Sequence, residues 1–261
     1  MELNLKGRRV LITGASQGIG EGLALAFARE GCALKLVARS ADKLAALAER
    51  AAALSGERAE TLALDMTAPG EIDRIAEFAG DIDVLVNNAG GIPGGTLWDV
   101  NEDAWRKGWE LKVFGYINLT RAIYPRMKAR GGGVILNNIG NGGENFDFDY
   151  IAGTTGNAAL MAFTRALGGR SLADDGIRVV GVNPGPVDTE RIRKVLSVRA
   201  KARFGDASRS GDLLANYPLG RAATVDEIAD LFVYLASDRS AYTSGTIITV
   251  DGGITSRRAI G

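Results

Sequence analysis

Hydrophobic and polar positions follow two periods along this chain. Short runs of consecutive apolar residues, bounded by glycine or polar residues, are typical of strands buried on both faces of a sheet. Such runs predict seven strands, at residues 9–13, 34–38, 61–64, 84–86, 134–138, 177–182 and 246–250. Between them lie longer stretches with apolar residues three and four positions apart, which is the helical spacing. These predict helices at about 18–30, 40–54, 101–129 and 151–173.

Strands that alternate with helices favour right-handed crossovers and a parallel sheet covered on both sides. We therefore expect an α/β, doubly wound, Rossmann-like fold with a seven-stranded, mostly parallel sheet and helices on both faces. The chain shows no internal repeat and no linker-like segment, so residues 1–261 are expected to form a single domain.

Composition excludes several classes of function. Of the 261 residues 46% are hydrophobic and 24% are charged, which is typical of a globular protein. Lys+Arg and Asp+Glu each number 31, so the net charge gives no argument for nucleic acid or a membrane surface as partner. The sequence contains no signal-like leader and no apolar run of transmembrane length, and we expect a cytoplasmic protein.

Cysteine and histidine usage narrows the chemistry further. Cys32 is the only cysteine and histidine is absent, so no intramolecular disulfide can form. The commonest metal ligand and the commonest general base are missing together. We expect no metal site, and a Ser-His-Asp triad is excluded.

A glycine-rich segment joins the first predicted strand to the first predicted helix. It carries Gly14, Gly18 and Gly20, with Ser16, Gln17 and Ile19 between them. Glycine is required where the backbone has positive φ or approaches a pyrophosphate closely, and the helix start offers free N–H groups to the phosphates. Because the strand-turn-helix context is present, the segment predicts a dinucleotide-binding loop.

The glycine spacing is G-x-x-x-G-x-G, and further segments follow it in order: Asp65-Met66, 87–90 (NNAG), 183–185 (NPG), 218–221 (PLGR) and 250–253 (VDGG). With these motifs the chain resembles the short-chain dehydrogenase/reductase family over nearly its whole length. The resemblance implies that Asp65 and Met66 contact the adenine and that Asn88, Ala89 and Gly90 line the middle of the cofactor. It places Pro184, Gly185, Val187 and Thr189 at the nicotinamide end. It also implies a homodimer or homotetramer that forms through the long helices.

The end of the second strand bears on the choice of cofactor. NAD-binding proteins usually have an acidic residue there, whereas this chain has Ala38-Arg39-Ser40. Arg39 can pair with a 2′-phosphate or remain a solvated surface arginine. Gln17 stands where many NADP-binding members of the family have a basic residue. On balance we expect NADP rather than NAD.

The family is known for an Asn-Ser-Tyr-Lys catalytic set, in which a phenol with an ordinary pKa of about 10 is made more acidic by a nearby lysine. Residues 132–140 and 158–165 match the segments on either side of this set and join without a gap. This alignment places Gly140 at the serine position, Gly153 at the tyrosine position and Asn157 at the lysine position. A preceding segment, 110–115, places Lys112 at the asparagine position.

The Asn and Lys positions therefore look exchanged. We hypothesise a rebuilt site with Tyr150 as acid/base, Lys112 as its charge partner and Asn157 as a polar bridge. If residue 150 is helical, its ring lies one turn before the usual tyrosine on nearly the same face. Asn141 or Thr154 are candidates to replace the serine. Two alternatives stay open: Lys112 is a solvated lysine and Tyr150 a packing aromatic, or Tyr150 aligns with the family tyrosine through compensating gaps.

Residues 190–217 correspond to the family's variable substrate segment. Between Glu190 and Asp212 there are seven basic residues against three acidic ones. This pattern indicates either recruitment of an anionic small-molecule substrate or the solvated face of a mobile lid. The glycines at 140, 142, 143 and 153 either leave room for a bulky substrate or serve loop geometry.

The leading expectation is an NAD(P)-dependent oxidoreductase that interconverts a carbonyl and an alcohol by hydride transfer, with a rearranged proton-donor site. The alternatives are a catalytically weak or inactive cofactor-binding relative that acts as a sensor or partner subunit, and a non-redox lyase on the same fold.

Overall fold

A computed structural model describes residues 2–257 and contains one seven-stranded sheet. Its strand order is β3-β2-β1-β4-β5-β6-β7, and every neighbouring pair is parallel. The strands are β1 (Arg9–Thr13), β2 (Ala33–Ala38), β3 (Glu60–Ala63), β4 (Val84–Asn87), β5 (Gly133–Asn138), β6 (Ile177–Pro184) and β7 (Thr246–Val250). The order reverses beside β1, as in doubly wound folds. The predicted fold class is confirmed, and the sheet is parallel throughout rather than mostly parallel.

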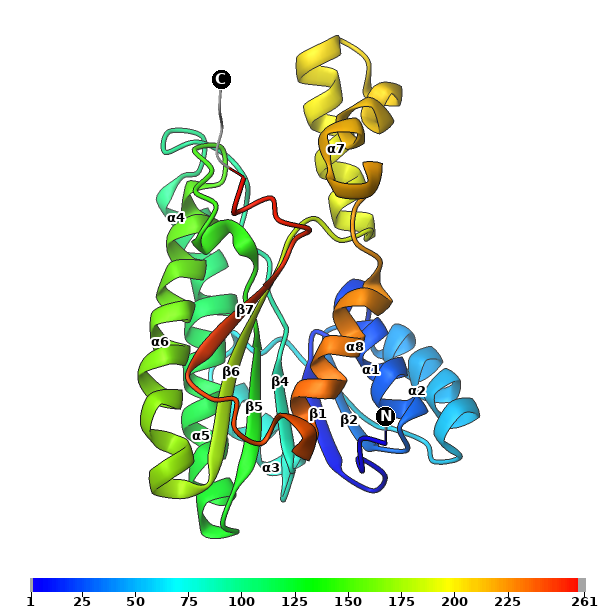
Figure 1. The fold of residues 1–261 in the computed structure, drawn as a ribbon, viewed down its shortest axis with the longest axis vertical. Helices are drawn as coiled ribbons and strands as arrows, with labels where there is room; N and C mark the ends of the chain where they lie inside the picture. The colour runs from blue at the N-terminus through cyan, green and yellow to red at the C-terminus, as the bar shows by residue number, and fades with distance from the viewer. Residues whose placement is uncertain (1, 258–261) are drawn as a thin grey trace.

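Helices cover both faces of this sheet (Figure 1). On one face α1 packs against α2 and α8, and on the other α3 packs against α5 while α6 lies along β6. The helices are α1 (Gly18–Arg29), α2 (Ala41–Ser55), α3 (Glu71–Ala79), α4 (Glu102–Trp109), α5 (Gly115–Ala129), α6 (Ile151–Asp175), α7 (Glu190–Phe204) and α8 (Val225–Ala236). None of the helices in the described part of the chain has the length and apolarity needed to cross a membrane.

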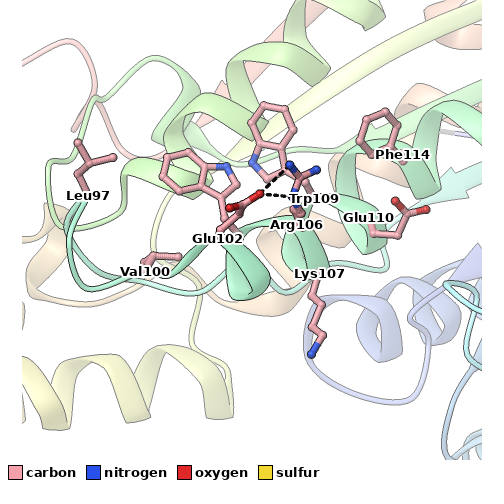
Figure 2. Close-up of a pocket in the computed structure, with 9 residues that line it drawn as sticks. Leu97, Val100, Glu102, Arg106, Lys107, Trp109, Glu110 and Phe114 are labelled. Carbon is pink, nitrogen blue, oxygen red and sulfur yellow. Dashed lines mark hydrogen bonds and ion pairs between the residues drawn. The ribbon is translucent and has the colours of Figure 1, made fainter.

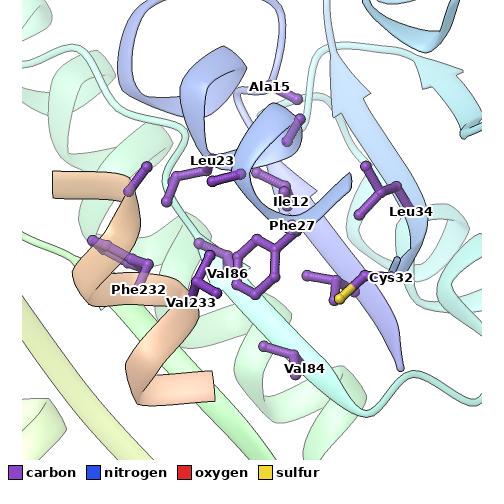
Figure 3. Packing of buried hydrophobic residues seen from close by; sticks show 14 of the residues in the cluster. Ile12, Ala15, Leu23, Phe27, Cys32, Leu34, Val84, Val86, Phe232 and Val233 are labelled. Atoms are coloured by element: carbon purple, nitrogen blue, oxygen red, sulfur yellow. The ribbon is translucent and has the colours of Figure 1, made fainter. Parts of the chain in front are cut away.

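The core beneath α1 and α8 is closely packed. Figure 3 shows Phe27 among strand residues such as Ile12 and Val86, with Phe232 of α8 facing them. At the crossing of the two helices, a Cβ on Gly22 would lie 2.0 Å from Cγ1 of Val225. Only a glycine lets the helices approach this closely.

Three local features differ from the sequence prediction. The helix expected over 101–129 is interrupted by a π-helical segment, Glu110–Phe114, between α4 and α5. Helix α3 was not predicted, and it spans nine residues after Gly70, which has a φ of 80°. Helix α8 was also missed, although a capping box of Thr224 and Glu227 starts it. Beyond the carboxyl end of β6, α7 extends away from the sheet (Figure 1).

Candidate active site

The glycine loop lies at the carboxyl edge of the sheet, between β1 and α1. Gly14 has a φ of +65°, and a Cβ on it would lie 2.8 Å from Cα of Ala89. A Cβ on Gly20 would lie 2.2 Å from the carbonyl oxygen of Gly14. At the start of α1 the N-cap residue, Gln17, makes no side-chain cap hydrogen bond. The backbone here is as tight as a pyrophosphate cradle requires, and the helix start is free of a side-chain cap.

Asn88 fastens this loop to the middle of the sheet. Its amide nitrogen donates to the carbonyl oxygens of Thr13 and Gly14, at 2.9 and 3.2 Å. Its side-chain oxygen accepts a 2.7 Å hydrogen bond from Asn138, at the end of β5. Three strand ends are thereby held in fixed positions beneath the loop.

The segment after β6 returns to the same edge. The Cγ2 atom of Thr189 lies 3.4 Å from the place a Cβ on Gly18 would occupy. Val187 forms an isolated parallel bridge with Ala223, and Gly185 lies against Asp251, after β7. The structure therefore brings residues of the predicted nicotinamide end to the side of the glycine loop.

At the other end, Arg39 is exposed after β2. Hydrogen bonds from the backbone N–H and hydroxyl of Thr67 hold the pKa of the Asp65 carboxyl below its ordinary value, and the charge of Arg39 adds to this effect. The side chain of Met66 packs over Gly115, at the start of α5.

One nearby cation was missed by the sequence reasoning. The ammonium of Lys43, in the first turn of α2, donates a 3.1 Å hydrogen bond to the side-chain oxygen of Gln17. The loop that lacks a basic residue of its own therefore has one beside it. Its position in the first turn of the helix that starts just after Arg39 was the signal that could have revealed it.

Lys112 is positioned by the π-helical segment that follows α4. Such segments insert an extra residue into a helix and are frequent at functional sites. The side-chain stem of Lys112 lies along Gly90, and its Cδ atom is 3.0 Å from the place a Cβ there would occupy. Only 9% of the residue is exposed. The expectation of a solvated helix lysine is therefore wrong.

The ammonium of Lys112 is held by two acceptors. It donates to the carbonyl oxygen of Ile139, and at 2.8 Å to the side-chain oxygen of Asn157, on α6. Burial, and to a smaller extent the charge of Arg191, lowers the pKa of Lys112 to about 7. The two residues that look exchanged in the sequence thus form a direct hydrogen-bonded pair, and the lysine can gain or lose a proton near neutral pH.

Tyr150 is not helical, contrary to the assumption made from its sequence position. It is the N-cap of α6, with φ −138° and ψ 34°. From there the side chain folds back over the first turn of the helix. A Cβ on Gly153 would lie 1.9 Å from Cζ of Tyr150. The ring therefore occupies the space into which a side chain on residue 153 would begin to extend.

This placement brings the ring and Asn157 to the same side of Gly142. The place a Cβ on Gly142 would occupy lies 3.3 Å from Nδ2 of Asn157 and 3.5 Å from Cδ1 of Tyr150. The hydroxyl of Tyr150 is one bond beyond Cζ, so it lies close to α6 rather than where the tip of a tyrosine on residue 153 would reach.

The sequence reasoning did not single out Arg191 as a neighbour of Tyr150. Its Nη2 atom, which comes from α7, lies 3.4 Å from the Tyr150 hydroxyl oxygen and 3.0 Å from the carbonyl oxygen of Ile92. In the sequence Arg191 is one of seven basic residues in the same segment, and nothing there distinguishes it.

The two candidates to replace the serine, Asn141 and Thr154, differ in their hydrogen bonding. The amide nitrogen of Asn141 donates to Asp251 at 3.2 Å and to Thr255 at 3.5 Å. The Thr154 hydroxyl is buried and has no hydrogen-bond partner among the described residues.

The glycines also leave less space than a bulky substrate would need. Asn157 lies against Gly140 and Gly142, Met161 against Gly143, and the Tyr150 ring against Gly153. The space that these missing side chains leave is filled by the protein itself.

A cavity of about 750 Å³ lies on the outer side of α4 and the π-helical segment (Figure 2). Glu102 and Arg106 are hydrogen-bonded beside it, at 2.8 Å. Trp109 forms part of its wall, and its ring nitrogen donates a 3.0 Å hydrogen bond to the carbonyl oxygen of Ala152. Tyr150, Lys112 and Asn157 do not line this cavity, which is therefore separate from their cluster.

Comparison with known proteins covers nearly the whole chain. Residues 14–255 match the family described as enoyl-(acyl carrier protein) reductase. The chain is 31% identical over 255 residues to 7α-hydroxysteroid dehydrogenase of Escherichia coli, covering 96% of this chain and 95% of the relative. It is 34% identical over 251 residues to dehydrogenase/reductase SDR family member 6 of Rattus norvegicus, with coverages of 95% and 98%.

Among solved structures, L-sorbose reductase of Gluconobacter frateurii, complexed with NADPH and L-sorbose, superposes with a TM-score of 0.91. The two chains are 33% identical, and the match covers 99% of this chain and 100% of that one.

Proposed function

Since the chain belongs to the short-chain dehydrogenase/reductase family, we propose that it interconverts a carbonyl and an alcohol with NADP or NAD, using a rearranged proton-donor site. The observation that carries the proposal is the position of Tyr150. Its ring lies in the space of a side chain on Gly153, beside the hydrogen-bonded Lys112 and Asn157. A phenol and an ammonium are thus near the family's usual site, although they come from other positions in the sequence.

The glycine loop fits a dinucleotide. The pyrophosphate would lie over Gly14, Gly18 and Gly20, where the backbone is tight and the start of α1 offers N–H groups. The nicotinamide end would lie along Thr189 and Gly185. When bound, the nicotinamide supplies or accepts a hydride.

We propose NADP as the preferred cofactor. Arg39 follows β2 where an acidic residue would select NAD, and the Lys43 ammonium lies beside the glycine loop. Two cations at this end suit a 2′-phosphate. The NADPH bound to the similar L-sorbose reductase supports the same preference.

Proton transfer is assigned to Tyr150. Its hydroxyl would donate to the oxygen of the bound carbonyl as the alcohol forms, and accept the proton in the reverse direction. Lys112 supports this step from below. With a pKa of about 7, Lys112 can carry a positive charge near neutral pH, and this charge would stabilise the phenolate that remains after Tyr150 donates its proton.

The test is single-turnover oxidation of NADPH, and of NADH in parallel, against a panel of carbonyl compounds. The wild type should oxidise NADPH faster than NADH. Tyr150→Phe should lower the rate about 100-fold or more, in the range of general acid catalysis, and Lys112→Met should lower it as well.

Two matched controls keep the test specific. Tyr124→Phe removes a hydroxyl that bonds to Asp175, and Lys128→Met removes an ammonium that pairs with the same residue, both away from the site. These variants should turn over like the wild type. Unchanged turnover in both Tyr150→Phe and Lys112→Met would refute the rebuilt site, and a wild type inactive on every carbonyl would refute the reaction.

A further inference from the structure

Arg191 differs from the other basic residues of α7 in what its guanidinium contacts. Its neighbours on the helix pair with carboxylates: Arg193 with Asp188, Lys194 with Glu190 and Arg199 with Asp147. Arg191 makes no ion pair with any carboxylate in residues 2–257. Three of the six basic residues of α7 are therefore balanced locally, whereas Arg191, Lys201 and Arg203 form no ion pair with the described residues. Of these three, Arg191 is the one that hydrogen-bonds to Tyr150.

The guanidinium also has donors to spare. Both of its hydrogen bonds to described residues come from Nη2, one to Ile92 and one to Tyr150. Nη1 and Nε make none with this part of the chain. Because the guanidinium is planar and presents five donors, the unused side suits a planar, bidentate acceptor.

A second positive charge lies nearby without a carboxylate to balance it. Lys112 is bound by neutral oxygens, those of Ile139 and Asn157. The charge of Arg191 is one cause of its lowered pKa, after burial, and no carboxylate opposes that effect. The site thus holds two cations that repel each other, and a bound anion would relieve this repulsion.

We propose that Arg191 binds a carboxylate of the substrate, so that the chain acts on oxo acids. The inference rests on the proposed function, and it names the substrate class for that reaction. It replaces the broader idea that the whole basic segment recruits anions, since most of those cations are already paired.

The separation of the two donors limits the substrate further. The Tyr150 hydroxyl would bind the carbonyl oxygen of the substrate. Arg191 Nη2 lies only 3.4 Å from the oxygen of that hydroxyl. A carboxylate bound by the guanidinium must therefore be near the carbonyl in the same molecule. A 2-oxo or 3-oxo acid meets this requirement, and an acid with a long chain between the two groups does not.

The first test compares each acid with its neutral ester: pyruvate with methyl pyruvate, and acetoacetate with methyl acetoacetate. Take whichever of the two oxo acids is the faster substrate of the wild type. Its kcat/KM should exceed that of its own methyl ester by about 10- to 100-fold, the range expected for a hydrogen bond to a charged group. Arg191→Met should remove this preference, and Arg191→Lys should restore part of it. Arg193→Met is the matched control on the same helix and should keep the preference.

A binding measurement separates this inference from the proposed function. Calorimetric titration of the NADP complex with 3-hydroxybutanoate should show binding about tenfold weaker or more in Arg191→Met, and unchanged in Arg193→Met. The wild type could reduce no carbonyl and still bind 3-hydroxybutanoate more tightly than Arg191→Met does. In that case carboxylate binding by Arg191 is supported and the reductase proposal fails. Two results would overturn the proposed role of Arg191: equal kcat/KM for acid and ester in the wild type, or 3-hydroxybutanoate binding in Arg191→Met that equals binding in the wild type.

Discussion

At the scale of single residues, the site depends on two side chains that reach it from sequence positions other than the family's usual ones. Tyr150 reaches the space over Gly153 from the residue before the helix, and Lys112 reaches Asn157 from the opposite helix. Each depends on a glycine that leaves room: Gly153 for the ring, and Gly90 for the lysine stem. The glycines in this site admit side chains of the protein, and their replacement is the most direct way to disturb it.

Gly153→Ala should disable the site while leaving the fold intact. The new Cβ would lie 1.9 Å from Cζ of Tyr150, so the ring must move. We expect kcat/KM to fall about 100-fold, as for loss of a general acid. The control is Gly169→Ala on the same helix, where a Cβ would meet nothing within 4 Å. That variant should keep full activity and gain up to about 1 kcal/mol of stability. Equal activity in the two variants would contradict the role given to the ring.

The buried Lys112 should make stability depend on pH. The pKa of an ordinary lysine is 10.5 and that of Lys112 in the fold is about 7, so between these values the unfolded chain binds more protons than the folded one. The contribution of Lys112 to the free energy of unfolding therefore rises with pH from about 7 upward and is lowest below that. Lys112→Met lacks this dependence, and the wild type should gain stability relative to it from pH 7 to 9.

Urea unfolding at several pH values measures this difference. Lys128→Met is the control, because Asp175 raises the pKa of Lys128 and both states keep the proton over this range. The difference in the free energy of unfolding between Lys128→Met and the wild type should not change with pH. Parallel curves for the wild type and Lys112→Met would show that the lysine is not buried as described.

At the scale of elements, helix boundaries and irregularities position the functional groups. The π-helical segment places Lys112 in the site, and the start of α6 at Ile151 leaves Tyr150 free to fold back as the N-cap. Apolar periodicity shows neither feature. The π-helical segment depends on a single extra residue in the helix, and the N-cap position of Tyr150 depends on a single pair of φ and ψ angles. The sequence therefore predicted the long helix α6 and placed Lys112 and Asn157 as candidates for one site, but it missed the interruption before α5 and the way the ring reaches its place.

The crossing of α1 and α8 is a tight contact between elements. In Gly22→Ala the Cβ would lie 2.0 Å from Cγ1 of Val225, which forces the helices apart or the valine into a poor rotamer. We expect a loss of about 1–3 kcal/mol in urea unfolding, and weaker NADPH binding because α1 carries the glycine loop. In a chain that already carries Val225→Ala, adding Gly22→Ala should cost much less stability. The double variant should therefore be nearly as stable as Val225→Ala alone. Additive effects would mean that the two residues do not contact each other.

At the scale of the molecule, buried parallel strands gave the most reliable sequence signal. Apart from β3, whose residues are mostly exposed, the strands are rich in apolar residues, and β1 and β7 begin and end where the pattern predicts. The carboxyl edge then collects the glycine loop, Asn88 and Thr189 from distant parts of the chain. Arg191 could not be selected in this way, because its proposed role depends on which unpaired cation of α7 lies beside Tyr150.

The outer face of α4 and α5 is where we propose that copies of the chain associate. It carries the 750 Å³ cavity and Phe114, whose exposed fraction is 46%. Burial of this apolar surface would stabilise a dimer or tetramer. Phe114→Glu should shift the mass measured by light scattering toward 27.4 kDa. Leu54→Glu on α2, with a matched exposure of 47%, should not. A wild type that elutes as a monomer would contradict the proposal.

The overlap between Tyr150 and residue 153 also constrains how such a site can evolve. A chain with a tyrosine at both positions cannot place both rings, because the first side-chain atom of one would lie 1.9 Å from the ring of the other. The two arrangements therefore exclude each other within one folded chain. A second tyrosine cannot be added to this site as a spare, and moving the phenol to residue 153 requires that Tyr150 be displaced or replaced in the same step.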